Sequence, residues 1–141
     1  TNEVRAFIRE GRIAEYRQLQ QRQLPFVPPH GMCSRRKSDA LISASGLVVV
    51  DIDHLASLEE AEQLRNHLFE DPYLGTRLAF VSPGGLGVKL FIPGDETVRW
   101  AMSYIQLLYA DTFKGEVDTC GKDIARCCFL SHDSNAKIFI P

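Results

Sequence analysis

The strongest constraint in this sequence is an apolar run that ends in two carboxylates. Residues 46–53 read Gly-Leu-Val-Val-Val-Asp-Ile-Asp. Consecutive valines after a glycine are typical of a buried β-strand, and the run is far shorter than the ~20 residues of a membrane span. Side chains alternate along a strand, so Asp51 and Asp53 are expected to point to the same side. The pattern predicts two neighbouring negative charges at the end of a buried strand.

Two like charges held side by side repel each other unless a cation lies between them. Carboxylate oxygens are hard ligands of the kind that Mg²⁺ and Mn²⁺ prefer. The alternative is that a strand-end aspartate caps the next helix. Because Ser57-Leu-Glu-Glu60 is already a capping box for that helix, we favour a metal-binding or catalytic role for Asp51 and Asp53.

Length and composition place the chain among globular proteins with a single domain, residues 1–141. The net charge is −2, so there is no global basic field and any contact with nucleic acid must come from a local patch. No apolar run is long enough to span a membrane. The chain starts at Thr1, without an initiator methionine or a signal peptide, which indicates a piece cut from a longer polypeptide.

The four cysteines form no CxxC pair. We expect them to be reduced thiols in the core of a cytoplasmic protein. A zinc site built from His30, Cys33 and Cys120 is the alternative, to which the spacing gives little support.

The order of the predicted elements indicates the fold class. We predict helices at 2–10 and 12–23, and then strand 47–51, helix 57–69, strands 77–82 and 86–92, helix 95–113, strand 126–131 and an edge strand at 137–140. The spacing of apolar residues in these helices predicts inward positions for Ile13, Tyr16, Leu58 and Leu108. From residue 46 onward the order β-α-β-β-α-β is that of the split βαβ, or ferredoxin-like, unit. We therefore expect an α/β (α+β) fold, with residues 1–45 as a helical extension and loop.

This topology brings three distant segments to one rim of the sheet. A right-handed crossover makes the first and second strands parallel, the hairpin turns the third strand back, and the fourth runs parallel to the third. The end of the first strand, the glycine turn and the loop before the fourth strand therefore meet. Because these places carry the most chemically active residues of the chain, their convergence indicates a functional site.

The glycine turn lies in the segment Ser82-Pro-Gly-Gly-Leu-Gly-Val-Lys89. Gly84 and Gly85 would let a polyanion approach backbone N–H groups, and Lys89 would supply a positive charge for phosphate. The segment is not a P-loop, because no Gly-Lys-Ser/Thr follows at the required spacing. The alternative is an ordinary glycine-rich hairpin with an exposed lysine.

The third segment, residues 116–126, offers Asp118 as a third carboxylate, with Lys122 and Arg126 as cations for phosphates. The alternative is a salt-bridged loop in which Asp123 caps a helical turn. Three carboxylates, a glycine turn and two or three cations are typical of two-metal phosphoryl or nucleotidyl transfer. In that chemistry the carboxylates hold divalent ions and the cations hold a triphosphate.

The three segments resemble the motifs of the archaeo-eukaryotic primase (primase-polymerase) superfamily. Those motifs are a DxD at a strand end, a serine-containing strand with a basic triphosphate contact, and a hydrophobic residue followed by Asp. Over nearly its full length the chain is also similar to the VirE N-terminal domain family of bacterial mobile elements. That likeness is carried by Arg17…Leu24-Pro25, residues 46–53 and, most specifically, Asp118-Thr-Cys-Gly-Lys-Asp-Ile-Ala-Arg-Cys-Cys-Phe-Leu-Ser-His-Asp133.

The resemblance implies a primase-like fold, with an RRM-like catalytic module over residues 46–141 that is often fused to a helicase. It implies that Mg²⁺ or Mn²⁺ is held by Asp51, Asp53 and Asp118. It also implies that a nucleoside triphosphate is contacted by Ser82, Lys89 and Arg126, and that the partner is single-stranded DNA. Many primase-polymerases have His where this chain has Lys89, and lysine neutralises phosphate with a different geometry.

Three functional hypotheses remain open. The first is a metal-dependent nucleotidyltransferase that makes or extends primers in the replication of a mobile element. The second is the same fold with lapsed catalysis, acting as a module that binds DNA or a helicase. The third is a phosphatase of the haloacid-dehalogenase kind with Asp51 as its nucleophile. Leu55 and the lack of repeated βαβ units argue against the third.

Overall fold

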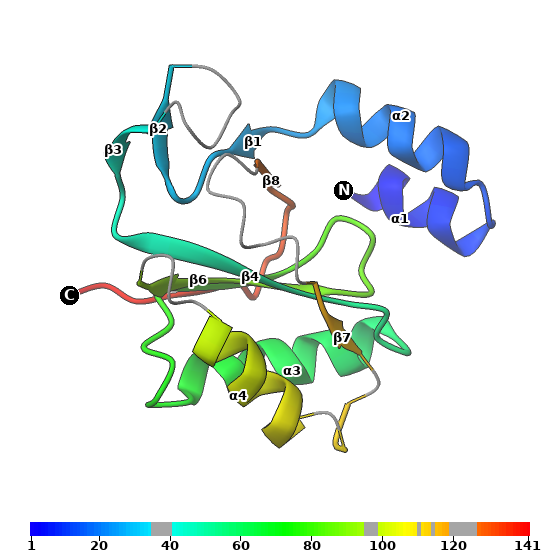
Figure 1. Cartoon of the computed structure of the whole chain (residues 1–141). Coiled ribbons are helices and arrows are strands. Elements are labelled where there is room, and N and C mark those ends of the chain that lie inside the picture. Colours follow the sequence, from blue (N-terminus) through cyan, green and yellow to red (C-terminus); the bar gives the residue numbers. More distant parts are fainter. Residues whose placement is uncertain (35–40, 95–98, 110, 114, 119–126) are drawn as a thin grey trace.

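The computed structural model describes residues 1–34, 41–94, 99–109, 111–113, 115–118 and 127–141. Within these ranges the helices are α1 (Asn2–Arg9), α2 (Ile13–Gln23), α3 (Leu58–Glu70) and α4 (Arg99–Tyr109). Figure 1 shows α3 and α4 against one face of a central sheet, with α1 and α2 on the opposite side. No helix in the described ranges is long and apolar enough to cross a membrane.

The central sheet joins five strands in the order β7-β4-β6-β5-β9. Their bounds are β4 (Leu47–Asp53), β5 (Leu78–Val81), β6 (Val88–Pro93), β7 (Glu116–Val117) and β9 (Lys137–Ile138). All of its strand pairs are antiparallel, and β4 and β5 therefore run in the same direction on either side of β6. The succession β4-α3-β5-β6-α4-β7 is the β-α-β-β-α-β order, and the predicted α+β class is confirmed.

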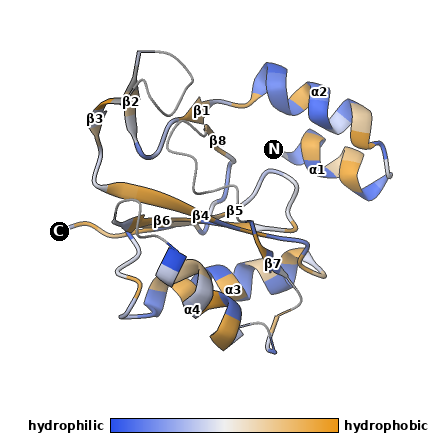
Figure 2. Ribbon diagram, in the orientation of Figure 1, coloured by the Kyte–Doolittle hydropathy of each residue, from blue (hydrophilic) through white to orange (hydrophobic). Residues whose placement is uncertain are grey.

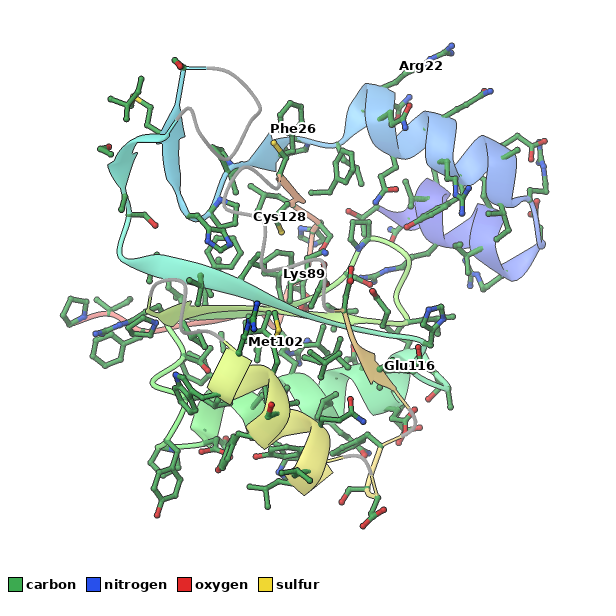
Figure 3. The ribbon with its side chains drawn as sticks, in the orientation of Figure 1. Arg22, Phe26, Lys89, Met102, Glu116 and Cys128 are labelled. Carbon is green, nitrogen blue, oxygen red and sulfur yellow. The ribbon has the colours of Figure 1, made fainter. Side chains whose placement is uncertain are left out.

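The two faces of this sheet bury different sets of side chains. Val48, Val50 and Ile52 belong to the larger core, which α3 and α4 complete. Val49 points the other way and packs with Phe80, Phe91 and Cys128. Figure 2 shows β4 as strongly hydrophobic, and Figure 3 places Lys89 and Cys128 on the side of the sheet away from Met102 of α4. Both faces of β4 are buried, which explains its uninterrupted run of valines.

Helix α3 begins where the capping box predicts. The side chain of Ser57 accepts a hydrogen bond from the N–H of Glu60, and the Glu60 carboxylate accepts one from the N–H of Ala56. One face of the helix then contributes the buried residues Ala61, Leu64, Arg65 and Leu68. Leu58 is exposed, which makes the inward position predicted for it wrong, because the first turn of α3 extends past the edge of the core.

The N-terminal extension is held mainly by its first helix. Val4 of α1 is buried, whereas α2 has no buried residue among those described. The burial predicted for Ile13 is wrong, since its side chain is exposed, and α2 is mostly hydrophilic in Figure 2. Two small antiparallel pairs complete this layer, β1 (Phe26–Val27) with β8 (Cys128–Phe129) and β2 (Gly31–Cys33) with β3 (Leu41–Ala44).

Three predicted boundaries differ from the structure. The fourth strand of the unit is β7, not residues 126–131, and the described part of that segment forms β8 against β1 of the extension. The connection between β5 and β6 spans residues 82–87, so it is longer than the predicted tight turn. Helix α4 ends at Tyr109, and Leu108 is exposed although its spacing predicted burial. The predicted edge strand at 137–140 is present as β9.

Candidate metal centre

Strand β4 carries two aspartates at its carboxyl end. Asp51 and Asp53 lie on the same strand face as Val49, away from α3 and α4. Asp51 is buried with 3% of its surface exposed, and Asp53 is half-buried. The strand ends at His54, whose φ of 62° lies in the left-handed region that side-chain-bearing residues rarely adopt. This conformation turns the chain immediately after the second carboxylate.

Strand β7 adds Asp118 to the same place. Ile52 lies opposite Val117, and the next N–H, that of Asp118, donates to the carbonyl oxygen of Asp51 at 2.8 Å. One ligand atom from each of the three aspartates lies within 4.8 Å of the others. Because each Mg–O distance is about 2.0–2.1 Å, two oxygens on one Mg²⁺ ion are at most ~4.2 Å apart, so the three carboxylates could share such an ion after a side-chain movement of under ~1 Å. Their metal-binding and catalytic roles stay predictions.

Lys89 places a positive charge at this site. It lies opposite Asp51 in the β4–β6 pair, and its Nζ donates to Oδ2 of Asp51 at 2.5 Å. The two side chains are 12% and 4% exposed, so this ion pair is almost fully removed from water. Burial acts to lower the pKa of the Lys89 ammonium, but the charge of Asp51 raises it, and the net direction is upward. Lys89 is therefore positively charged at neutral pH.

The remaining charge of the site is negative. Burial, together with the charge of Asp51, raises the pKa of Asp53, while Lys89 partly opposes this and Asp118 adds to it. Counting only the described residues, three carboxylates and one ammonium leave an excess of two negative charges when all four groups are ionised. A divalent cation would balance that excess, and a triphosphate could approach only after such neutralisation.

The loop at residues 82–87 lies beside the carboxylates. A Cβ built on Gly87 would lie 2.7 Å from the carbonyl oxygen of Ile52, 3.0 Å from Ser82 Oγ and 3.1 Å from Asp53 Oδ1. Only glycine permits this close approach, and the buried Ser82 hydroxyl and the Asp53 carboxylate both border this position. Gly84 and Gly85 were predicted to face the same ligand, but their nearest neighbours are the side chains of α1 and α2.

Tyr16 of α2 is a site neighbour that sequence reasoning missed. Its hydroxyl lies 3.4 Å from the position of a Cβ on Gly84. Burial raises the pKa of Tyr16, and the charges of Lys89 and Asp53 act on it in opposite directions. Helical spacing marked Tyr16 only as part of a buried face, because a contact between residues so far apart in the sequence leaves no local pattern.

Two predicted nucleotide contacts, Lys122 and Arg126, lie outside the described residues. The structure therefore places seven of the nine predicted site residues. It brings together Asp51, Asp53, Asp118, Lys89 and Ser82, and it sets Gly84 and Gly85 on the side of the loop that faces the N-terminal helices.

A family model described as "BT4734-like, N-terminal domain" matches residues 20–137. This range contains all three aspartates and excludes α1. No curated protein and no solved structure gave a significant match.

Proposed function

The chain belongs to the BT4734-like N-terminal domain family, and we propose that it is a metal-dependent nucleotidyltransferase of the primase-polymerase kind. Its substrates would be a nucleoside triphosphate and the 3′ end of a strand annealed to single-stranded DNA. A fused or associated helicase would be its partner in the replication of a mobile element. The resemblance to the VirE N-terminal domains and to the primase motifs supports this proposal, although the matching family model carries another name.

The observation that carries the proposal is the clustering of three carboxylates around a buried lysine. Asp51, Asp53 and Asp118 have ligand atoms within 4.8 Å of one another, and Lys89 contacts the most buried of them. Among the described residues, these three carboxylates are accompanied by one ammonium at the rim of the sheet, so negative charge is in excess there. Such an excess is what a site needs when it holds Mg²⁺ or Mn²⁺ together with a polyphosphate.

Each residue has a defined role in this proposal. The three aspartates would hold the divalent metal, which when bound activates a 3′-hydroxyl and stabilises the departing pyrophosphate. Lys89 would exchange its contact with Asp51 for a phosphate oxygen of the incoming nucleotide. Ser82, fixed beside Asp53 by the close approach at Gly87, would orient that nucleotide through its hydroxyl.

A second candidate function is a binding module with lapsed catalysis, and the Lys89–Asp51 ion pair favours it. A lysine ammonium already supplies a positive charge at one of the carboxylates, so the fold is held together there without a metal ion. The phosphatase hypothesis has no comparable support. It requires a doubly wound parallel sheet, whereas every strand pair in the described residues is antiparallel.

A primer-extension assay separates the two candidates. With Mn²⁺ or Mg²⁺, a labelled primer and a single-stranded template, we expect the wild-type chain to add nucleotides and release pyrophosphate. Asp118→Asn should reduce the rate at least ~100-fold, because it removes a carboxylate that acts on developing charge. The matched control is Asp111→Asn at an exposed position, which should keep the wild-type rate. Strand binding without any incorporation would reject the enzyme and favour the binding module.

A further inference from the structure

A pocket of about 430 Å³ lies between α1 and the loop at residues 82–87. Arg5, Ile8 and Arg9 line it from α1, Leu58 lines it from the start of α3, and residues 84–86 form the remaining wall. Figure 1 shows α1 alongside the loop that connects β5 to β6. None of the three aspartates lines this pocket, so it is separate from the candidate metal centre, although both use the same loop.

Arg5 brings an unsatisfied donor to this pocket. Its Nη2 donates to the carbonyl oxygen of Ser82 at 3.5 Å, whereas its Nε is buried and makes no hydrogen bond within the described part of the chain. A buried donor without an acceptor is unfavourable, and an anion that drew the guanidinium into the pocket would relieve that cost. The guanidinium lies against Gly85, where a Cβ would come within 3.3 Å of Nε.

The charges around Arg5 leave it available to an anion. Burial lowers the pKa of Arg5, while the more distant carboxylates of Asp133 and Glu62 raise it. The Asp133 carboxylate already receives two hydrogen bonds from Arg65, at 2.8 and 3.0 Å. Arginine stays protonated in proteins, so a positive charge remains at this wall of the pocket.

The rest of the pocket matches the other parts of a nucleotide. Arg9 is exposed one helical turn after Arg5 and adds a second guanidinium, a group that binds phosphate in a bidentate manner. Ile8, Leu58 and Leu86 give an apolar wall on which a base or sugar can pack. Small-ligand pockets typically measure about 300–1,000 Å³, and this one is within that range.

We infer that this pocket binds one nucleotide, with its phosphate on Arg5 and Arg9 and its base against Leu58 and Leu86. The inference goes beyond the proposed function, because it requires neither a metal ion nor catalysis. Two sources share this chemistry: a free nucleotide, and the 5′-phosphorylated terminal residue of a single strand. The two arginines of the pocket lie on α1, outside the region that the family model matches, whereas Leu58 and residues 84–86 lie inside it.

The test is a calorimetric titration of the wild-type protein in EDTA with two probes, ATP and a 5′-phosphorylated single-stranded tetranucleotide. We expect at least one probe to bind and Arg9→Gln to weaken that binding about tenfold. Arg5→Gln should weaken it at least as much. Arg22→Gln, a matched control at the far end of α2 where Figure 3 shows the side chain pointing into solvent, should leave the affinity unchanged. Because Arg9 is exposed, its replacement leaves the fold intact even if Arg5→Gln does not.

Binding of ATP alone would identify a free nucleotide as the occupant, and binding of the tetranucleotide alone would identify a strand end. The inference is overturned if neither probe binds, or if Arg9→Gln binds as tightly as the wild-type protein. These outcomes are independent of the metal centre. Mn²⁺ binding without nucleotide binding in EDTA would reject the pocket only, and the reverse result would reject the metal centre only.

Discussion

Asp51 has oppositely charged and like-charged neighbours at the same time. Lys89 lies across from it on β6, Asp118 lies across from it beyond β7, and Asp53 follows on its own strand. Direct cross-strand neighbours are about 4.5–5.5 Å apart at their Cβ atoms, so the carboxylates repel one another at short range. If this repulsion served no function, the replacement of one carboxylate would be a simple way to stabilise the fold.

We predict that Asp53→Asn stabilises the metal-free protein at pH 7. The folded pKa of Asp53 is raised by burial and by Asp51, so its ionised form costs stability at any pH above the unfolded pKa of 3.8. Thermal unfolding in EDTA should show a higher Tm for Asp53→Asn than for the wild-type protein. The gain should disappear as the pH falls to 3.8 and below.

Asp111→Asn removes a carboxylate from an exposed position and should leave the Tm unchanged. A lower Tm for Asp53→Asn than for the wild-type protein would mean that Asp53 is held by attractive contacts, against the raised pKa and the repulsion described above.

Lys89→Met should have the opposite effect. It leaves the Asp51 carboxylate buried without its ion-pair partner, which typically costs about 3–5 kcal/mol of unfolding free energy. Urea unfolding at pH 7 measures this loss, and Lys137→Met on the edge strand β9 is the control for a change in net charge. Because the folded pKa of Lys89 is raised, the contribution of the pair is complete below pH 10.5 and is lost as the pH rises through the folded value.

The double variant Asp51→Asn/Lys89→Met tests whether this loss comes from the buried charge. Replacement of both partners should restore most of the stability. A double variant as unstable as Lys89→Met alone would show instead that the lysine stem, and not its charge, supports the sheet.

Among the elements, the loop at residues 82–87 joins β5 to β6 and lies close to the end of β4 at Gly87. Gly87→Ala would place a Cβ 2.7 Å from the carbonyl oxygen of Ile52, a backbone atom that cannot move aside. We expect a loss of about 1–3 kcal/mol in urea unfolding, since the loop must shift away from Asp53. Gly84→Ala in the same loop makes only ordinary side-chain contacts, at 3.4 Å with the Tyr16 hydroxyl and 3.9 Å with Ile8, and should lose less than ~0.5 kcal/mol. Equal losses in both variants would contradict the close approach at Gly87.

One carboxylate of the C-terminal segment, that of Asp133, contacts both α3 and β5. Asp133 accepts hydrogen bonds from Arg65 at 2.8 Å and from the N–H of Val81 at 2.9 Å. Asp133→Asn should cost about 3 kcal/mol at pH 7, because Arg65 then stays buried without its counter-charge. Burial acts to raise the pKa of Asp133, but these hydrogen bonds and the charge of Arg65 lower it overall.

The pH dependence of this loss is fixed by the same contacts. With a lowered folded pKa, the stabilisation by Asp133 is present above the unfolded value of 3.8 and is lost as the pH falls through the folded value. Unfolding curves of the wild-type protein and Asp133→Asn should therefore converge in acid. A difference that stays constant down to pH 2 would contradict an ionic role for Asp133.

Local sequence patterns predicted the elements that are long or capped. The valines were sufficient to predict β4, and the Ser57 capping box was sufficient to predict the start of α3. Burial on both faces and a helix cap are both encoded within a few residues. Strands β7 and β8 could not be assigned correctly, since two residues carry no periodicity and their pairing depends on distant partners. Topology predicted that the segment with Asp118 meets the end of β4, but as a loop before a strand at 126–131. Its pairing beside Asp51 next to β7, and the contacts of Tyr16 and Arg5, needed the three-dimensional structure.

For the molecule as a whole, the two faces of the central sheet differ in what they carry. One face is filled by α3 and α4 and supplies most of the core, while the other carries the charged residues and is approached by the N-terminal helices (Figure 1). This arrangement lets a single sheet hold three carboxylates rigidly at one rim, with Arg5 and Tyr16 placed nearby from another layer. Preorganisation of this kind is what a nucleotidyl-transfer site requires.

The decisive measurement is the titration of Mn²⁺ into the wild-type protein, followed through the electron paramagnetic resonance signal of the free ion. We predict a saturable Mn²⁺ site that is lost in Asp118→Asn and retained in Asp111→Asn. We also predict that a bound nucleoside triphosphate tightens Mn²⁺ binding only where the three aspartates are intact. Failure of the folded wild-type protein to bind Mn²⁺, or equal binding by Asp118→Asn, would contradict the metal centre and the function built on it.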